Sequence, residues 1–230
     1  MENHYDMIII GAGHNGLVAA AYLAKQGKSV LVLERRSIVG GSVVTESFGN
    51  GFTVDSVWTG GTLRPEIIKD LKLSLPKVTE RPPFISLIGS ASHGARREHL
   101  ILEADPARAA DSIRRFSDRD AARWPEFVRF MNKAAKILEK AYATIMPRLP
   151  MEFNAREGFG LMELGLKLRL AGRKDMLNFI RALPMTAQEL VEEYFESEVV
   201  KAAVASLAIH GVTLGPMSAG TGYTLIHNWL

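Results

Sequence analysis

Three glycines and one glutamate near the start of the chain have the spacing of a dinucleotide-binding site. Gly11, Gly13 and Gly16 form a G-x-G-x-x-G pattern, and Glu34 follows roughly 20 residues further on. The first glycine of such a pattern permits a tight turn, the second lets the backbone approach a pyrophosphate, and the third lets a helix pack closely on a strand. The carboxylate is placed to accept hydrogen bonds from ribose hydroxyls. This spacing predicts a site for a dinucleotide such as FAD or NAD.

The segments around these residues have the patterns of the elements that such a site needs. Residues 7–10 form an apolar run without polar alternation, which predicts a central strand of a parallel sheet, buried on both faces. Residues 17–26 are rich in alanine and leucine and predict a helix that ends at Gly27 and directs its N-terminus at the phosphates. Residues 29–33 predict a second strand, which ends at Glu34. The chain therefore opens with a predicted βαβ unit.

The residues after the second strand separate the candidate nucleotides. Glu34 argues against NADP, because a carboxylate repels a 2′-phosphate, although Arg35 or Arg36 could accept one. An NAD-binding domain normally continues with a crossover helix and a third parallel strand. Here the paired glycines 40–41 follow instead, and then a segment without helical period that turns at residues 49–51. An NAD-dependent dehydrogenase thus fits the residues up to 34 and not those beyond.

The stretch ERRSIVGGSVVTE, after GAGHNGLVAAAYL, resembles the FAD-dependent oxidoreductases of the phytoene dehydrogenase and amine-oxidase superfamily. Within it, the chain is most similar to the N-terminal portion of the phytoene-dehydrogenase-related subgroup. The resemblance implies FAD as the cofactor and hydride transfer at a C–C bond of a hydrophobic small-molecule substrate. The stretches FSDRDAARWPEF, YFESEVVKAAVA and GPMSAGTGYTLIHNWL are similar to the helical substrate domain of the same relatives.

The resemblance also implies which residues hold the cofactor, while it assigns no catalytic residue. The implied set has a pyrophosphate group, an adenosine group and a group along the cofactor: Gly11, Gly13, Asn15 and Gly16; Glu34 with one or both of Arg35 and Arg36; and Gly40, Gly41 and Ser42. Amine oxidases usually have arginine after the paired glycines, so Ser42 favours the phytoene-dehydrogenase-like branch. Residues 55–61 fall where relatives approach the flavin ring, and Trp58 there is either a ring neighbour or, as we expect, a packed core residue.

Composition excludes several other chemistries. The absence of cysteine excludes disulfides, thiolate nucleophiles and redox-active dithiols. The six histidines show no metal-ligand spacing, and a net charge of +3 is too small to indicate binding of nucleic acid. No signal peptide is visible, and no apolar stretch reaches the roughly 20 residues that span a bilayer. We expect a cytoplasmic protein, with contact at a membrane surface as an alternative.

The predicted fold class is α/β: a Rossmann-like FAD-binding βαβ unit with an incomplete parallel sheet, plus a mainly helical substrate-domain region. We assign residues 1–104 to the FAD-binding region and 105–230 to a truncated substrate-domain region. Only two strands are clear, whereas a doubly wound dinucleotide fold has about five or six. We therefore expect further chain, a second polypeptide or a homo-oligomer to complete the sheet. The alternative function is a catalytically silent nucleotide-binding or assembly subunit.

Local signals predict most of the remaining elements. Short strands are expected at 84–88 and 100–103, and helix starts at Asp105, Ser117 and Thr186. Residues 161–181 are basic and leucine-rich. We expect them to form an ordinary helix pair that packs on the core, and the alternative is a helix that lies on a membrane surface.

Overall fold

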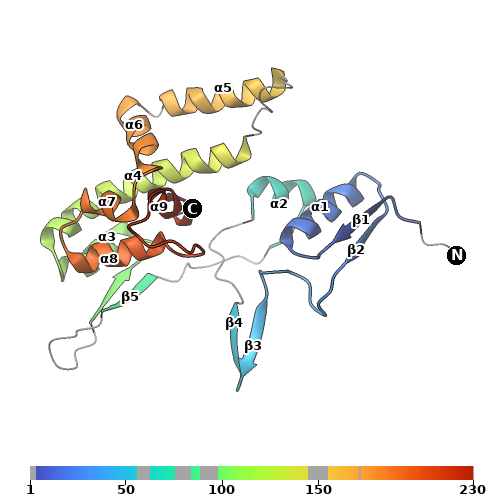
Figure 1. The fold of residues 1–230 in the computed structure, drawn as a ribbon, viewed down its shortest axis with the longest axis horizontal. Coiled ribbons are helices and arrows are strands. Elements are labelled where there is room, and N and C mark those ends of the chain that lie inside the picture. The colour runs from blue at the N-terminus through green and yellow to red at the C-terminus, as the bar shows by residue number, and fades with distance from the viewer. Residues whose placement is uncertain are drawn as a thin grey trace. The chain divides into compact units, whose positions relative to one another are not determined.

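The computed structural model divides the chain into two compact units, Met1–Val78 and Thr79–Leu230, each of which is described by itself (Figure 1). The structure describes residues 4–55, 63–75, 84–88, 98–144, 155–170 and 172–229. Trp58, and with it the expected approach to a flavin ring, lies outside the described residues. No helix within the described part of the chain is long and apolar enough to cross a membrane.

Unit 1 opens with the predicted βαβ unit. Strand β1 (Met7–Ile10) and strand β2 (Val30–Leu33) pair in parallel, with Met7 opposite Val30 and Ile10 opposite Leu33. Helix α1 (His14–Lys25) connects them and ends just before Gly27, as expected. Strands β3 (Thr45–Gly49) and β4 (Phe52–Asp55) form the predicted antiparallel hairpin, and α2 (Pro65–Leu71) follows with proline in its first turn. The α/β fold class with a short parallel sheet is confirmed.

The predicted burial of β1 on both faces is wrong for this chain. Ile8 and Ile10 have 59% and 88% of their surface exposed. Within the described residues, β1 pairs only with β2, and the sheet stops at two strands. Burial of a strand on both faces requires neighbouring strands and covering layers, and the apolar sequence of β1 alone cannot supply them. The sequence of β1 is therefore typical of a strand buried between other layers, whereas its side chains are exposed to solvent here.

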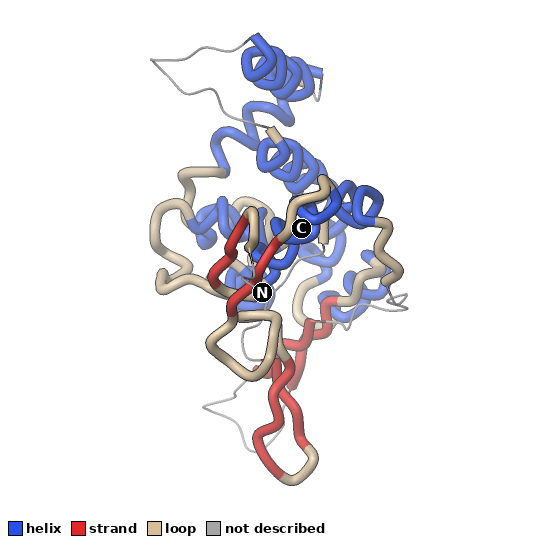
Figure 2. Tube along the Cα trace, turned by 90° about the vertical axis from the view of Figure 1, so that its right-hand side faces the viewer, coloured by secondary structure: helices blue, strands red, loops and turns tan. Residues whose placement is uncertain are grey.

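Unit 2 is mainly helical (Figure 2). Most of its elements contribute side chains to one buried core. It begins with the antiparallel hairpin β5 (Phe84–Ile88) and β6 (Glu98–Leu102). The helices are α3 (Pro106–Arg114), α4 (Asp118–Ala143), α5 (Ala155–Leu170), α6 (Arg173–Ala182), α7 (Ala187–Glu192), α8 (Glu198–Leu207) and α9 (Thr221–Asn228).

The predicted helix starts at the head of α3, α4 and α7 are confirmed. Asp105 accepts a hydrogen bond from the N–H of Ala107 at 2.9 Å, and Ser117 accepts one from the N–H of Asp120 at 3.0 Å. Thr186 and Glu189 form the reciprocal capping box. These caps satisfy backbone donors that the first turn of a helix otherwise leaves without a partner.

The core of unit 2 includes the β5–β6 hairpin as well as the helices. Phe127 and Met131 of α4 are fully buried at its centre, and Leu100 and Leu102 of β6 belong to the same buried cluster. The boundary predicted from the sequence, between residues 104 and 105, places this hairpin in the nucleotide-binding region. Its apolar face packs with the helices of unit 2, and the division of the chain into two compact units falls between Val78 and Thr79.

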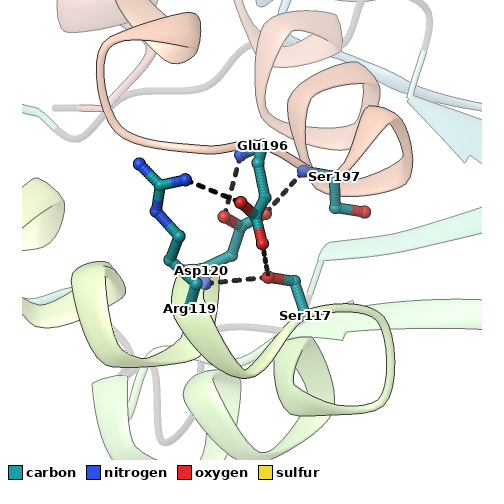
Figure 3. Close-up of polar contacts among 5 residues, drawn as sticks. All are labelled: Ser117, Arg119, Asp120, Glu196 and Ser197. Carbon is teal, nitrogen blue, oxygen red and sulfur yellow. Dashed lines mark hydrogen bonds and ion pairs between the residues drawn. The ribbon is translucent and has the colours of Figure 1, made fainter.

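A buried carboxylate joins the start of α4 to the turn between α7 and α8 (Figure 3). Asp120 is fully buried, and its two oxygens accept hydrogen bonds from the N–H groups of Glu196 and Ser197, both at 2.9 Å. At the surface above it, Glu196 pairs with Arg119 at 2.7 Å and accepts a hydrogen bond from Ser117. Each of these polar groups has a partner within the cluster, so the cluster stabilises the fold rather than forming an open site.

Candidate dinucleotide-binding site

The loop between β1 and α1 presents the N-terminus of α1 for an anion. Gly11 donates a hydrogen bond to the carbonyl of Leu33 at 2.7 Å, which fixes the loop at the end of β2. Helix α1 begins at His14 with Gly13 at its N-cap position, and no side chain of the described residues caps it. Its first turn contains no acidic residue. The free N–H groups and the positive end of the helix dipole fit a pyrophosphate.

Two of the glycines are needed because backbone segments approach each other closely. A Cβ atom at position 16 would overlap the carbonyl oxygen of Gly11, so the third glycine of the pattern allows α1 to pack on the end of β1. A Cβ atom at position 41 would lie 2.9 Å from the Cα of Gly13. Only glycine at these positions leaves room for the observed packing.

The paired glycines, Gly40 and Gly41, lie directly against residues 11–13 between β1 and α1, which we call the phosphate loop. Gly40 donates a hydrogen bond to the carbonyl of Ala12 at 2.8 Å, and Gly13 and Gly40 form an isolated parallel bridge. Two motifs that are well separated in the sequence thus form one backbone surface. The fold brings together seven of the predicted site residues, which are Gly11, Gly13, Gly16, Glu34, Arg36, Gly40 and Gly41.

Glu34 lies at the end of β2 and ties this surface together. One of its carboxylate oxygens accepts a hydrogen bond from the N–H of Ala12 at 2.7 Å, and the other accepts one from the N–H of Arg36 at 2.9 Å. The hydrogen bonds from Arg36 and Ala12, helped by the positive charge of Arg36, lower the pKa of Glu34. The group is therefore an anion at neutral pH. Each carboxylate oxygen keeps a second lone pair, with which it can accept a hydrogen bond from a ribose hydroxyl.

The structure gives the two arginines different surroundings. Arg36 donates a hydrogen bond to the carbonyl of Gly41 at 3.2 Å and forms an ion pair with Glu46. Sequence reasoning missed the ion pair of Arg36 with Glu46, although an acid ten residues after a basic residue at a turn is a weak signal for such a pair. Arg35 is exposed and forms no ion pair with any described residue.

Asn15 and Ser42, the two remaining predicted residues, are also exposed, one in the first turn of α1 and one just after the paired glycines. The described residues contain no group of three or more histidine, aspartate or glutamate side chains that could hold a metal ion.

Comparison with known proteins defines the class first. Residues 9–60 match the model of the NAD(P)-binding Rossmann-like domain, and this range includes the phosphate loop, Glu34 and the paired glycines. The chain therefore carries a Rossmann-like unit of the kind that binds a dinucleotide. The solved structure of the Rab GDI from Plasmodium falciparum has a similar fold, with a TM-score of 0.52 at 16% identity, over all of this chain and 49% of that one.

The particular relatives follow from the sequence. Pyridine nucleotide-disulfide oxidoreductase domain-containing protein 2 of Rattus norvegicus is 31% identical over 99% of this chain and 41% of its own length. One of the subunits of limonene dehydrogenase from Castellaniella defragrans is 38% identical over 53% of this chain and 22% of its own length. The chain is thus homologous to the rat protein, and it spans about two fifths of that relative's length.

Proposed function

We propose that this chain provides the FAD-binding unit, and part of the substrate-binding region, of an oxidoreductase that transfers hydride at a C–C bond of a hydrophobic substrate. The contact of Gly40 and Gly41 with the phosphate loop carries this proposal. In this chain the segment that follows β2 turns back to contact the phosphate loop. In a simple NAD-binding domain the chain continues at this point into a crossover helix. The relative named for limonene, an apolar hydrocarbon, supports a hydrophobic substrate.

In this proposal the protein holds and orients the cofactor, and the flavin, when bound, supplies the hydride acceptor or donor. The N-terminus of α1 and the glycines 40–41 hold the pyrophosphate, and Glu34 accepts hydrogen bonds from the ribose. Asn15 contacts the pyrophosphate, one or both of Arg35 and Arg36 contact the adenosine end, and Ser42 lies along the cofactor. A cytoplasmic location, expected from the absence of cysteine, remains part of the proposal.

Binding of FAD is tested by titration of the cofactor-free protein with FAD and, separately, with NAD. We expect saturable FAD binding that Glu34→Ala weakens by about tenfold or more, since it removes a charged hydrogen-bond acceptor. Glu66→Ala, which removes a carboxylate from the first turn of α2, is the matched control and should bind FAD normally. Saturating binding of NAD without uptake of flavin would overturn the proposal.

A second candidate is a nucleotide-binding or assembly subunit without catalytic activity of its own. Two findings support this candidate. The chain spans 41% and 22% of the lengths of the two relatives above, and one of them is named as a subunit of a dehydrogenase. The two candidates are separated by adding limonene or other apolar alkenes and alkanes anaerobically to the FAD-loaded protein. Substrate-dependent bleaching of the flavin supports the enzyme, and its absence with every substrate supports the silent subunit.

We also propose that further polypeptide, either more chain, a second subunit or a second copy, completes the sheet of unit 1. The exposed side chains of Ile8, Ile10 and Leu33 support this, because an open parallel strand with apolar faces is normally covered. The test is the mass and the FAD content of the 230-residue chain in solution. A stable, FAD-saturated, catalytically active monomer would contradict the proposal.

A further inference from the structure

Helix α5 is apolar on two opposite sides. On one side Leu164 is buried and Leu168 packs against the core cluster of unit 2. On the other side lie four side chains that are each more than half exposed, and they recur at positions i, i+3, i+7 and i+11. We call them the α5 stripe: Phe159, Met162, Leu166 and Leu170. This spacing places them on one face of the helix.

The sequence favoured a helix pair packed on the core, and that prediction accounts for only the inner side of α5. Helix α5 contacts α4 and α6, and Figure 1 shows it at the periphery of the helical unit. A surface helix normally carries charged and polar residues on the side away from the core. Helix α6 adds two more half-exposed apolar residues, Leu177 and Ile180. The α5 stripe is thus an exposed apolar surface that would be more stable in an apolar environment than in water.

Positive charge borders the α5 stripe. Helical periodicity places Lys167 on one border and Arg169 on the other. Among the described side chains of α5, Glu163 is the acidic one beside the stripe, and it lies between Lys140 and Lys167 at 3.1 and 3.0 Å. These two lysines lower the pKa of Glu163, so its negative charge is present and neutralised.

Further cations follow without neutralising partners. Arg169, Arg173 and Lys174 form no ion pair with any residue that the structure describes. The surroundings of the stripe therefore carry a net positive charge, which suits an anionic partner. A helix with exposed apolar residues between cations has the composition of one that lies in a lipid interface, where its apolar face enters the acyl boundary and its cations contact phosphate groups.

We propose that α5 binds the surface of a membrane that contains anionic phospholipid, with the α5 stripe inserted at the boundary between headgroups and acyl chains. The cations at 167, 169, 173 and 174 contact the lipid phosphates. The inference goes beyond the proposed function and does not depend on it, because neither FAD nor catalysis enters the argument.

The test is co-sedimentation of the protein with phosphatidylcholine vesicles, with and without an equal share of phosphatidylglycerol. We expect binding to the anionic vesicles that falls as salt is added. Met162→Glu/Leu166→Glu should weaken it by at least about tenfold, because a charged side chain does not enter the acyl boundary. Arg169→Gln/Lys174→Gln should weaken it by about fivefold for each cation removed.

The matched control is Leu87→Glu/Met217→Glu, which makes the same chemical changes at residues that are 82% and 72% exposed elsewhere in unit 2. It should bind as the unchanged protein does, with the same circular dichroism. Methionine oxidation by peroxide gives an independent reading. Met162 should be oxidised about as fast as Met217 without vesicles, and anionic vesicles should protect Met162 and leave Met217 unprotected.

Four results would overturn the inference. The first is absence of binding to anionic vesicles, and the second is equal loss of binding in the stripe variant and the control. The third is a self-associating protein that becomes monomeric in the stripe variant and never binds vesicles. That outcome would mean that a second copy of the chain covers the α5 stripe. Slow oxidation of Met162 without vesicles would likewise contradict an open face.

Discussion

The two units of this protein bury their apolar residues very differently. In unit 1, the buried apolar residues among those described are Ala12 and Val44, both in the loops of the candidate site. In unit 2 a continuous cluster of buried side chains runs through the β5–β6 hairpin and most helices. Strands β1 and β2 of unit 1 are nevertheless as apolar as any core segment. Unit 2 therefore has a core of its own, whereas unit 1 has the sequence of a core without the layers that would bury it.

This difference indicates what holds each unit together. Unit 2 depends on the removal of apolar surface from water, which is the main stabilising contribution in a folded domain. Unit 1 depends more on close backbone approach at glycines and on carboxylates that accept backbone N–H groups. Asp6 is a second example of the latter, because it accepts hydrogen bonds from the N–H and the hydroxyl of Ser29 at 2.8 and 3.0 Å. Substitutions of the same kind should therefore have different effects in the two units.

The largest difference is expected for removal of a buried isoleucine. Ile113 of α3 is fully buried, so Ile113→Ala should lower the free energy of unfolding of unit 2 by about 2–5 kcal/mol. Ile10→Ala removes the same atoms from a side chain that is 88% exposed, and its cost should stay within about 0.5 kcal/mol. Urea denaturation followed by tryptophan fluorescence measures the first, and hydrogen exchange of the α1 amides measures the second.

A large effect of Ile10→Ala would break this comparison. It would mean that the exposed face of β1 is covered in solution, by a second copy of the chain or by a bound partner. The dependence of the effect on protein concentration distinguishes these two cases, because self-association increases with concentration.

The next effect concerns the buried carboxylate of unit 2. Asp120→Ala leaves the N–H groups of Glu196 and Ser197 without their acceptor inside the protein, at a cost of about 1–3 kcal/mol for each amide. The control is Asp118→Ala in the same helical turn, where the side chain is 91% exposed and the cost should stay within about 0.5 kcal/mol. Thermal unfolding of the three proteins tests this, and equal midpoints for the two variants would contradict the assigned role of Asp120.

The sequence of this chain predicts local structure better than it predicts which segments pack against one another. Helix starts at Asp105, Ser117 and Thr186 depend on residues within one turn, so the chain itself contains the signal. The exposure of Ile8 and Ile10 depends on which layers cover the sheet, and the strand sequence carries no information about that.

The candidate site divides in the same way. The spacing of the glycines and the acid predicted which segments meet, since it follows from the geometry of the βαβ unit. Two other interactions could not be predicted from the sequence. One is the ion pair of Arg36 with Glu46, and the other is the pair of hydrogen bonds that Asp120 accepts from residues 196 and 197. Both depend on long-range folding, and in the sequence Asp120 resembles an ordinary acid in the first turn of a helix.

A smaller effect is expected from adding one methyl group to a helical glycine. Gly16→Ala should destabilise unit 1 by about 1–3 kcal/mol, because the new Cβ would overlap the carbonyl oxygen of Gly11. It should also abolish dinucleotide binding. Gly165→Ala in α5 meets no atom within 4 Å and should instead stabilise its helix by about 0.5–1 kcal/mol. Hydrogen exchange in α1 and α5 measures both, and unchanged exchange in α1 would show that the packing of α1 on β1 is looser than described.

The smallest effect concerns Glu34, a partly buried carboxylate that, like Asp120, accepts backbone N–H groups. Hydrogen bonds from the backbone of Arg36 and Ala12 lower the pKa of Glu34 in the folded protein below the ordinary value for glutamate. The unfolded chain therefore binds this proton more readily, so the contribution of Glu34 to stability is complete above the ordinary pKa and is lost as the pH falls through the lowered one. Titration of the side-chain carboxyl carbon by NMR should show a midpoint below that of a short glutamate peptide. Arg36→Ala keeps the backbone N–H that Glu34 accepts and removes the positive charge beside it, so the midpoint should rise slightly and remain below the peptide value. A midpoint at or above the peptide value in the unchanged protein would mean that Glu34 does not hold the phosphate loop in solution.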